Sequence, residues 1–365
     1  MKHVNKMFAW LATAVLATSC LNDNDTYRAG FVFEKPASAI SSYFANNTGD
    51  SLVFFSYGNW ALKGLSGYNN SWVTIPVGNG KGNTVYCLQA EFKQNTTGEG
   101  RYAAFRVDDT DHPGEANYSF LFFQFATRGD GSLGNAADVK KITGSEGSVI
   151  ELEYDDVHRP TSLMMRKNDI ALRNISFTYN NRDSLMRIDD EGTTYQCSYG
   201  KDFQPGTLRT ANDTIEYTSR YYPNGIPASA NYIFNFEQRH AYGSTCVTYR
   251  FPDNGVSLTP DSLHNADSLF YYNNGVMTEK LGLTYSADDN RKQSVDVNQL
   301  LHGIEQCDPY LLLSLYRYAR NTSIIATAKS EHDTYVVTTT LNSDRSVHTM
   351  TVTCGKETVT YTFEY

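Results

Sequence analysis

The order of apolar and polar residues divides the chain into one apolar N-terminal stretch and many short alternating segments. Five apolar or alternating runs, separated by turn-rich pieces such as "GNGKGN", lie at residues 51–58, 72–77, 84–92, 101–107 and 118–126. Runs of this length and spacing predict the strands of a sandwich of about a hundred residues. We therefore expect a first, mainly β domain over residues 36–130.

The second half of the chain repeats a hairpin pattern. An apolar-x-Tyr strand end, a loop rich in Asp and Asn, and a returning apolar strand occur at residues 152–163, 177–188, 247–258 and 283–295, and without the tyrosine at 337–352. Such loop residues tolerate the positive φ angles that tight hairpins require. We expect a curved antiparallel sheet over residues 148–365, preceded by a linker with a short helix at 131–147.

One stretch of the second domain has helical character, residues 296–320. Asp308 fits an N-cap and Pro309 the first helical position. Leu312, Leu315 and Tyr316 follow at helical spacing. This pattern predicts a helix whose leucines cover the concave face of the sheet, and a partner-binding helix is the alternative.

The N-terminus has the three parts of a secretory signal. Lys2 and Lys6 precede an apolar run from Met7 to Ala17, and small residues follow up to Ser19. The run is too short to span a bilayer as a helix, which needs about 20 residues. Residues 1–19 are therefore expected to be a signal peptide, with residues 20–35 as anchor and tether.

The residues around the expected cleavage site resemble a bacterial lipobox. In "LATSC" the cysteine is Cys20, although Ala17 stands where leucine is usual. The resemblance implies that Cys20 becomes the acylated first residue, and several acyl chains make a stable anchor. Asp23 and Asp25 are similar to the export signal of surface lipoproteins in Bacteroidetes. The implied location is the outer membrane, lipid-anchored and exposed at the cell surface.

The composition of the chain limits the classes of partner that we expect it to bind. The formal net charge is −9, and removal of Lys2 and Lys6 with the signal makes it −11. An acidic chain without a basic run argues against nucleic acid as a partner. The five cysteines besides Cys20 form no C-x-x-C pair, so no zinc site is predicted and their pairing stays open: Cys87, Cys197, Cys246, Cys307 and Cys354.

The first domain resembles a BACON domain over residues 37–127. The landmarks are two tryptophans, a Gly-rich turn, an Asn and Arg pair and a glutamine near the end of the last strand: Trp60, Trp72, Gly78, Gly80, Gly82, Asn95, Arg101 and Gln124. The resemblance implies an immunoglobulin-like β-sandwich and carbohydrate binding. Trp60 and Trp72 are candidate sugar-stacking residues, and the alternative is that both rings lie in the core.

The hairpins of residues 148–365 resemble YD-type repeats. The sequence contains no H-E-x-x-H, G-x-S-x-G or P-loop motif, so we predict no catalytic residue, cofactor or metal. The first hypothesis is a non-enzymatic surface lipoprotein that binds a polysaccharide or a surface protein partner in a glycan-capture assembly. A structural spacer or adhesin is the second, and a glycoside hydrolase, which needs two suitably spaced carboxyl groups, is the third.

Overall fold

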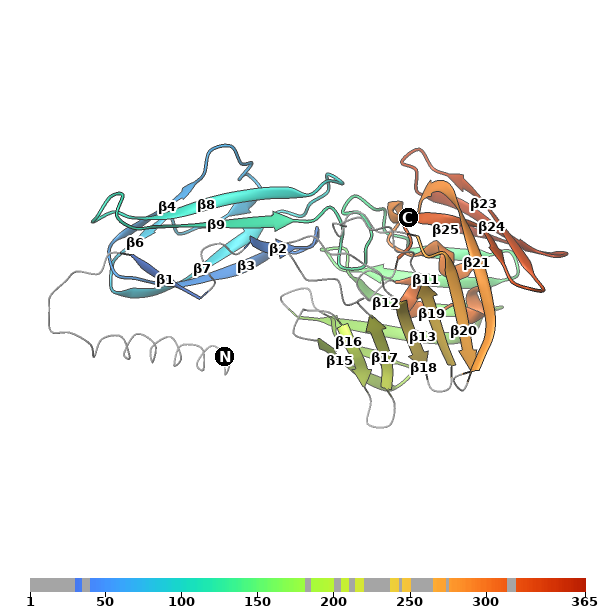
Figure 1. The fold of residues 1–365 in the computed structure, drawn as a ribbon. Helices are drawn as coiled ribbons and strands as arrows, with labels where there is room; N and C mark the ends of the chain where they lie inside the picture. Colours follow the sequence, from blue (N-terminus) through green and yellow to red (C-terminus); the bar gives the residue numbers. More distant parts are fainter. Residues whose placement is uncertain are drawn as a thin grey trace.

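The protein consists mainly of β-strands, arranged in several sheets that form two units side by side (Figure 1). The computed structural model describes residues 30–34, 40–180, 185–199, 205–209, 214–219, 237–242, 245–250, 265–273, 276–313 and 320–365. Cys20, Asp23 and Asp25, with the expected signal peptide, lie outside the described residues.

The N-terminal unit is a sandwich of two sheets. One sheet has the order β1-β3-β7-β5, with bounds β1 (Phe31–Phe33), β3 (Gly49–Ser56), β7 (Thr84–Phe92) and β5 (Val73–Thr74). The other has the order β2-β9-β8-β4-β6, with bounds β2 (Ile40–Tyr43), β9 (Asn117–Gln124), β8 (Arg101–Asp109), β4 (Trp60–Gly64) and β6 (Asn79–Gly80). The five runs predicted from the sequence correspond to β3, β5, β7, β8 and β9, whereas β1, β2, β4 and β6 were not predicted.

Apolar side chains from both sheets form the core of the sandwich. Phe54 on β3 and Leu88 on β7 pack with Phe105 on β8 and Phe122 on β9, and all four are buried. The alternation of the strands produces this arrangement, because every second residue points to the same face of a sheet. The opposite faces of both sheets are therefore left to solvent or to other parts of the molecule.

The C-terminal unit is a closed antiparallel sheet in which each strand pairs with the next and β25 pairs back with β10. Its first strands are β10 (Lys141–Gly144), β11 (Ser148–Tyr154), β12 (Pro160–Lys167), β13 (Ile170–Tyr179), β14 (Leu185–Asp190) and β15 (Thr193–Tyr199). Five more follow: β16 (Pro205–Arg209), β17 (Thr214–Ser219), β18 (Glu237–Tyr242), β19 (Thr245–Arg250) and β20 (Ser268–Asn273). The last are β21 (Val276–Asp289), β22 (Ser323–Lys329), β23 (Thr334–Leu341), β24 (Val347–Cys354) and β25 (Glu357–Glu364).

The single helix predicted over residues 296–320 is not evident. The described part of this stretch instead contains short helical turns: η2 (Val297–Leu300), η3 (Ile304–Gln306) and the one-turn helix α2 (Pro309–Leu312). Gly303 has a φ of 91°, which interrupts a right-handed helix. Asp308 does cap α2, since its side chain accepts hydrogen bonds from the backbone of Tyr310 and Leu311. Residues 314–319 lie outside the described residues.

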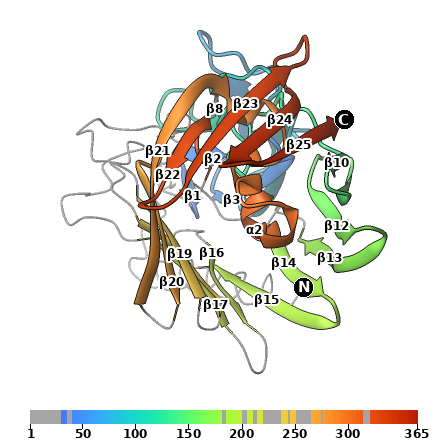
Figure 2. The ribbon, with the colours of Figure 1, turned by 90° about the vertical axis from the view of Figure 1, so that its right-hand side faces the viewer.

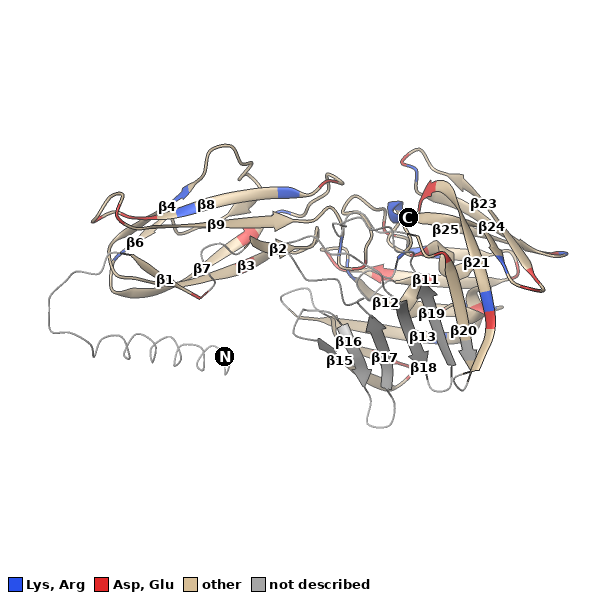
Figure 3. Cartoon of the chain, viewed as in Figure 1, with Lys and Arg blue, Asp and Glu red and all other residues tan. Residues whose placement is uncertain are grey.

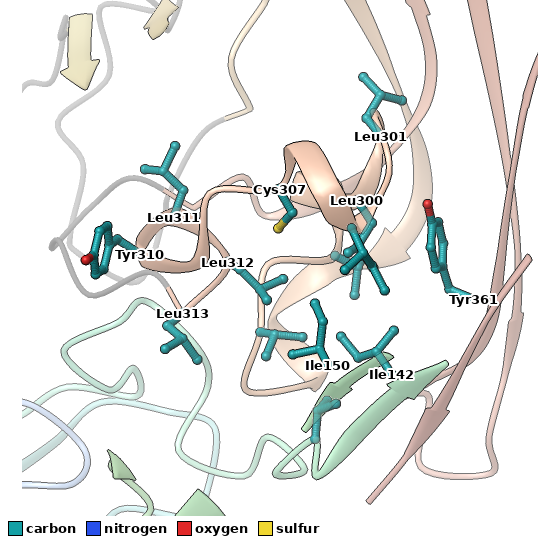
Figure 4. Close-up of a cluster of buried hydrophobic side chains, with 14 of the residues drawn as sticks. Ile142, Ile150, Leu300, Leu301, Cys307, Tyr310, Leu311, Leu312, Leu313 and Tyr361 are labelled. Carbon is teal, nitrogen blue, oxygen red and sulfur yellow. The ribbon is translucent and has the colours of Figure 1, made fainter. Parts of the chain in front are cut away.

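These turns fill the inside of the closed sheet (Figure 2). Leu300, Leu312 and Leu313 are almost fully buried and belong to the same apolar cluster as Ile142 on β10 and Ile150 on β11 (Figure 4). Full burial of one leucine contributes about 1.5–3 kcal/mol, so this cluster is a main source of stability for the unit.

Buried polar contacts connect the two units. Arg128 is 3% exposed and donates hydrogen bonds to Asp138 at 3.0 Å and to the backbone oxygen of Ala136 at 2.9 Å. His158 contacts the other oxygen of Asp138 at 2.5 Å. The segment 131–147, expected to be a linker with a short helix, contains no helix, and its second half forms β10 of the closed sheet.

One further expectation about the hairpins differs from the structure, and a second lies partly outside the described residues. Residues 283–295 do not turn back as a hairpin, because β21 runs on to Asp289 and enters the short turn η1 (Asn290–Lys292). Asp289 caps that turn through its side chain. In the pattern at 247–258, residues 251–258 lie outside the described residues.

Candidate binding surface

An aromatic patch lies on the outer face of the five-stranded sheet, and it consists of Phe44, Tyr102, Phe123 and Phe125. Tyr102 on β8 stands opposite Phe123 on β9, with ring centroids 4.5 Å apart. Phe125 follows at 4.8 Å from Phe123, and Phe44 lies 5.7 Å from Phe125. The four rings form one continuous row.

The row exists because β9 alternates with aromatic residues on both faces. Phe120 and Phe122 point into the core, while Phe123 points outward and is only partly buried. Tyr102 is 47% exposed, and Ile40 at the start of β2 is 49% exposed. Neither β2 nor β9 carries a charged residue, as Figure 3 shows for β9. Further along the same face, Lys63 on β4 and Arg106 on β8 both pair with Asp108. Exposed aromatic rings on an uncharged part of a sheet face are typical of binding surfaces.

A polar network supports the patch from the core side. Arg101 donates two hydrogen bonds to the side-chain oxygen of Gln124, and its guanidinium lies 4.8 Å from the ring centroid of Trp72. Burial lowers the pKa of Arg101. The side chain of Asn95 donates to the backbone oxygen of Phe125 at 2.9 Å. The landmarks that suggested a BACON domain thus include side chains that contact one another directly beneath the patch.

Both candidate tryptophans lie in the core. Trp60 is 1% exposed and packs against Phe54 and Tyr86, with centroid distances of 5.2 and 4.9 Å. Trp72 is 2% exposed and packs against Phe92. Both tryptophans therefore belong to the core, which was the alternative to sugar binding. Neither indole presents a face on which a sugar ring can stack.

The alternation of aromatic residues in "FLFFQF" is visible in the sequence, but the predicted binding residues were the tryptophans, and Phe123 and Phe125 were not among them. Only the register between β8 and β9 brings Tyr102 beside Phe123. The aromatic patch therefore could not be predicted from the sequence without the pairing of β8 with β9.

A partly buried ion pair lies in the closed sheet. Arg173 on β13 donates to both carboxylate oxygens of Asp190 on β14, and the hydroxyl of Tyr310 on α2 donates to the same carboxylate at 2.5 Å. Burial and the neighbouring Asp190 raise the pKa of the Tyr310 hydroxyl. Both carboxylate oxygens of Asp190 accept from Arg173, and one of them also accepts from Tyr310 and so connects α2 to β14.

A histidine sits between two tyrosines in the same unit. The Nε2 atom of His302 lies 2.9 Å from the hydroxyl of Tyr271, and its ring packs edge-on against Tyr335. Burial lowers the pKa of His302, and the charge of Glu279 opposes that shift.

Within the described ranges, no three His, Cys, Asp or Glu side chains are grouped so that they could hold a metal ion. Cys87, Cys307 and Cys354 are free thiols, so none of these three cysteines takes part in a disulfide. In the part of the chain that the structure describes, no helix has the length and apolar character needed to cross a membrane.

No known family model matches this chain, and no curated protein does. Among solved structures, a porin-like protein from Bacteroides uniformis aligns over 62% of this chain and 97% of its own, with 11% identity and a TM-score of 0.38. A Bacteroides ovatus GH5 xyloglucanase in complex with a heptasaccharide aligns over 30% of this chain, with 14% identity and a TM-score of 0.22. The chain spans 21% of that enzyme's length.

The E. coli chaperone DraB aligns over 63% of this chain and 96% of its own, with 9% identity and a TM-score of 0.21. TM-scores this low do not establish a shared fold. Two of these three proteins come from Bacteroides species.

Proposed function

We propose that this protein is a non-enzymatic lipoprotein of the outer-membrane surface that binds a glycan, or a partner protein of a glycan-capture assembly, through the aromatic patch. Its N-terminal unit is a BACON-like sandwich of the immunoglobulin type, and its C-terminal unit is built from YD-like hairpins. The observation that carries the proposal is the row of rings around Tyr102 and Phe123, beside strands β2 and β9 that carry no charged residue. Aromatic side chains offer a large contact area and lose little conformational entropy on binding.

The anchor is the part of the proposal that rests on the N-terminal sequence. Cys20 carries the lipid, and Asp23 with Asp25 directs the protein to the outer face of the membrane. Cys20→Ala is expected to move the protein from the membrane fraction to the soluble fraction. Asp23→Asn combined with Asp25→Asn is expected to leave it membrane-bound but protected from protease added to whole cells.

The aromatic patch is tested with Tyr102→Ala and Phe123→Ala in the full-length protein. Binding to a glycan array, or recovery of a partner by cross-linking on intact cells, is expected to fall roughly tenfold or more. Tyr68→Ala is the matched control, because Tyr68 is 43% exposed and belongs to the loop after β4. Equal binding by the patch variants and the control contradicts a binding role for the patch.

A structural spacer is the second candidate function. The burial of Trp60 and Trp72 favours it, since both residues then serve the sandwich rather than a ligand. A spacer predicts that neither the glycan array nor the cross-linking experiment gives a signal with the wild-type protein.

A further inference from the structure

The outer face of strands β21 to β25 carries an array of threonines, which we call the threonine face. Strand pairing aligns them in rows. Thr340, Thr349 and Thr362 form one row and Thr338, Thr351 and Thr360 the next, and Thr353 stands opposite Thr358 in a third. Thr284 on β21 and Thr327 on β22 pair in the same way.

The hydroxyl groups of this face are ordered in pairs. Hydroxyl oxygens lie 2.7 Å apart in Thr340 and Thr349, 3.0 Å apart in Thr351 and Thr360, and 2.6 Å apart in Thr284 and Thr327. One hydroxyl of each pair donates to the other, so the second keeps its hydrogen for a partner outside the protein. Because a threonine side chain is stiff at χ1, these groups are held in place before any ligand arrives.

The three threonine rows on β23 to β25 are exposed or half-buried and contain no charged residue. Thr338, Thr340, Thr358 and Thr362 are exposed, and the other threonines of the rows are half-buried. Charged residues lie at the borders of these rows: Lys141 pairs with Glu364 on one side, and the exposed Lys329 lies beside Thr334 on the other. A face without charge has no electrostatic attraction for nucleic acid or for a charged peptide.

The strand propensity of threonine does not by itself explain why threonines are concentrated on the threonine face. Threonine does favour strands, and Thr–Thr pairs stabilise a sheet. The same closed sheet, however, carries charged pairs on the outer face of other strands, such as Glu151 with Arg166 and Arg187 with Asp189. Charged pairs can therefore form the outer face of this closed sheet, and the threonine face differs from those regions in its chemistry.

The threonine face presents hydroxyl groups, which donate and accept hydrogen bonds, together with methyl groups. This combination is complementary to the surface of a neutral sugar chain. Each threonine hydroxyl both donates and accepts, as sugar hydroxyls do, and the threonine methyl groups and Val336 offer apolar contact to the C–H groups of sugar rings. Adjacent strands of a sheet are rotated by about 20–25°, so the rows do not form a flat lattice. This geometry suits a single flexible chain better than a crystalline surface.

We propose that the threonine face binds a neutral polysaccharide chain, with the middle row of Thr338, Thr351 and Thr360 at its centre. The site is separate from the aromatic patch and does not depend on it.

The test uses the full-length protein in detergent, run in native gels that contain β-glucan, galactomannan or arabinoxylan, with polygalacturonate as an acidic comparison. At least one neutral polysaccharide is expected to retard the wild-type protein, and the retardation is expected to persist at high salt because no ion pair is involved. Polygalacturonate is expected to have no effect.

The decisive variant combines Thr338→Val, Thr351→Val and Thr360→Val, which removes three hydroxyls while keeping the side-chain shape and strand propensity. Its apparent affinity is expected to fall roughly tenfold to a hundredfold, the loss of about three hydrogen bonds. The control combines Thr178→Val and Thr193→Val, two exposed threonines elsewhere in the closed sheet.

Circular dichroism confirms that both variants fold. The proposal is overturned if no neutral polysaccharide retards the wild-type protein, or if the middle-row variant binds as tightly as the control. Tyr102→Ala separates this site from the aromatic patch, because the middle-row substitutions are expected to reduce the gel retardation by the same factor in the Tyr102→Ala protein as in the wild type.

Discussion

Arg101 and Gln124 are joined by two hydrogen bonds, from Nε and one Nη of the guanidinium to the same side-chain oxygen, at 3.0 and 2.7 Å. The side-chain nitrogen of Gln124 donates in turn to the backbone oxygens of Phe44, Ala45 and Asn47. A single glutamine thus fastens β8 and β9 to the chain that follows β2, directly beneath the aromatic patch.

Replacing Gln124 is expected to destabilise the sandwich. Gln124→Leu leaves the guanidinium of Arg101 and three backbone oxygens without this partner, and the free energy of unfolding should fall by about 2–4 kcal/mol. Tryptophan fluorescence during urea denaturation measures it, since Trp60 and Trp72 both lie in this core. Gln89→Leu, at an exposed position of β7, should change stability by less than about 0.5 kcal/mol. Similar losses in both variants would speak against this role.

The carboxylate of Asp190 is expected to hold α2 against the wall of the closed sheet. Asp190→Ala leaves Arg173 and the Tyr310 hydroxyl without their acceptor, and should cost about 3 kcal/mol. Amide exchange over residues 309–313 should accelerate in this variant. The neighbouring Asp189 makes an exposed ion pair with Arg187, so Asp189→Ala should leave both the free energy of unfolding and the exchange nearly unchanged.

His302 is expected to make stability depend on pH. Its pKa in the folded protein is lowered, so the unfolded chain takes up a proton first as the pH falls below about 6.5. Stability should therefore decrease from about pH 7 downwards, until the folded histidine also titrates. The decrease in unfolding free energy between pH 7.5 and pH 5 should be smaller in His302→Gln than in the wild type. His348→Gln, at an exposed position, is the control and should keep the wild-type slope.

Gly134 is expected to accept no side chain. A Cβ atom there would lie 1.8 Å from the backbone oxygen of Asn95 and 2.9 Å from the Cβ of Ala45. Gly134→Ala should lower the free energy of unfolding by about 1–3 kcal/mol, because the loops between the two units must separate. Gly78→Ala is the matched control, since nothing lies within 4 Å of its Cβ position. A Gly134→Ala protein as stable as this control would show that the loops yield easily.

The sequence predicted the parts of the fold that depend on local pattern. The long strands β7, β8 and β9 alternate clearly, and the hairpins β11–β12, β13–β14 and β23–β24 have recognisable turns. Short strands such as β6, with only Asn79 and Gly80, carry too few residues for any period to be visible. The helix over residues 296–320 was wrong in its length because the backbone at Gly303 departs from the helical conformation.

The binding surfaces could not be predicted in the same way. Tyr102 meets Phe123, and Thr338 meets Thr351 and Thr360, only through the register between strands. Register is set by the packing of whole sheets and is not visible within one strand. The two tryptophans were identified as candidates from residue type alone, and the packing around Trp60 and Trp72 then placed them in the core.

The pairing of β10 with β25 has a consequence for the way the closed sheet forms. β10 ends at Gly144 and β25 begins at Glu357. The first strand of the closed sheet therefore cannot pair with the last until all residues between them have been synthesised. Until then two strand edges stay open, and such edges are where chains aggregate. Contacts between residues so far apart in sequence also form slowly. The pairing of β10 with β25 is therefore the folding step at which a chaperone, or an error in the nascent chain, has its largest effect.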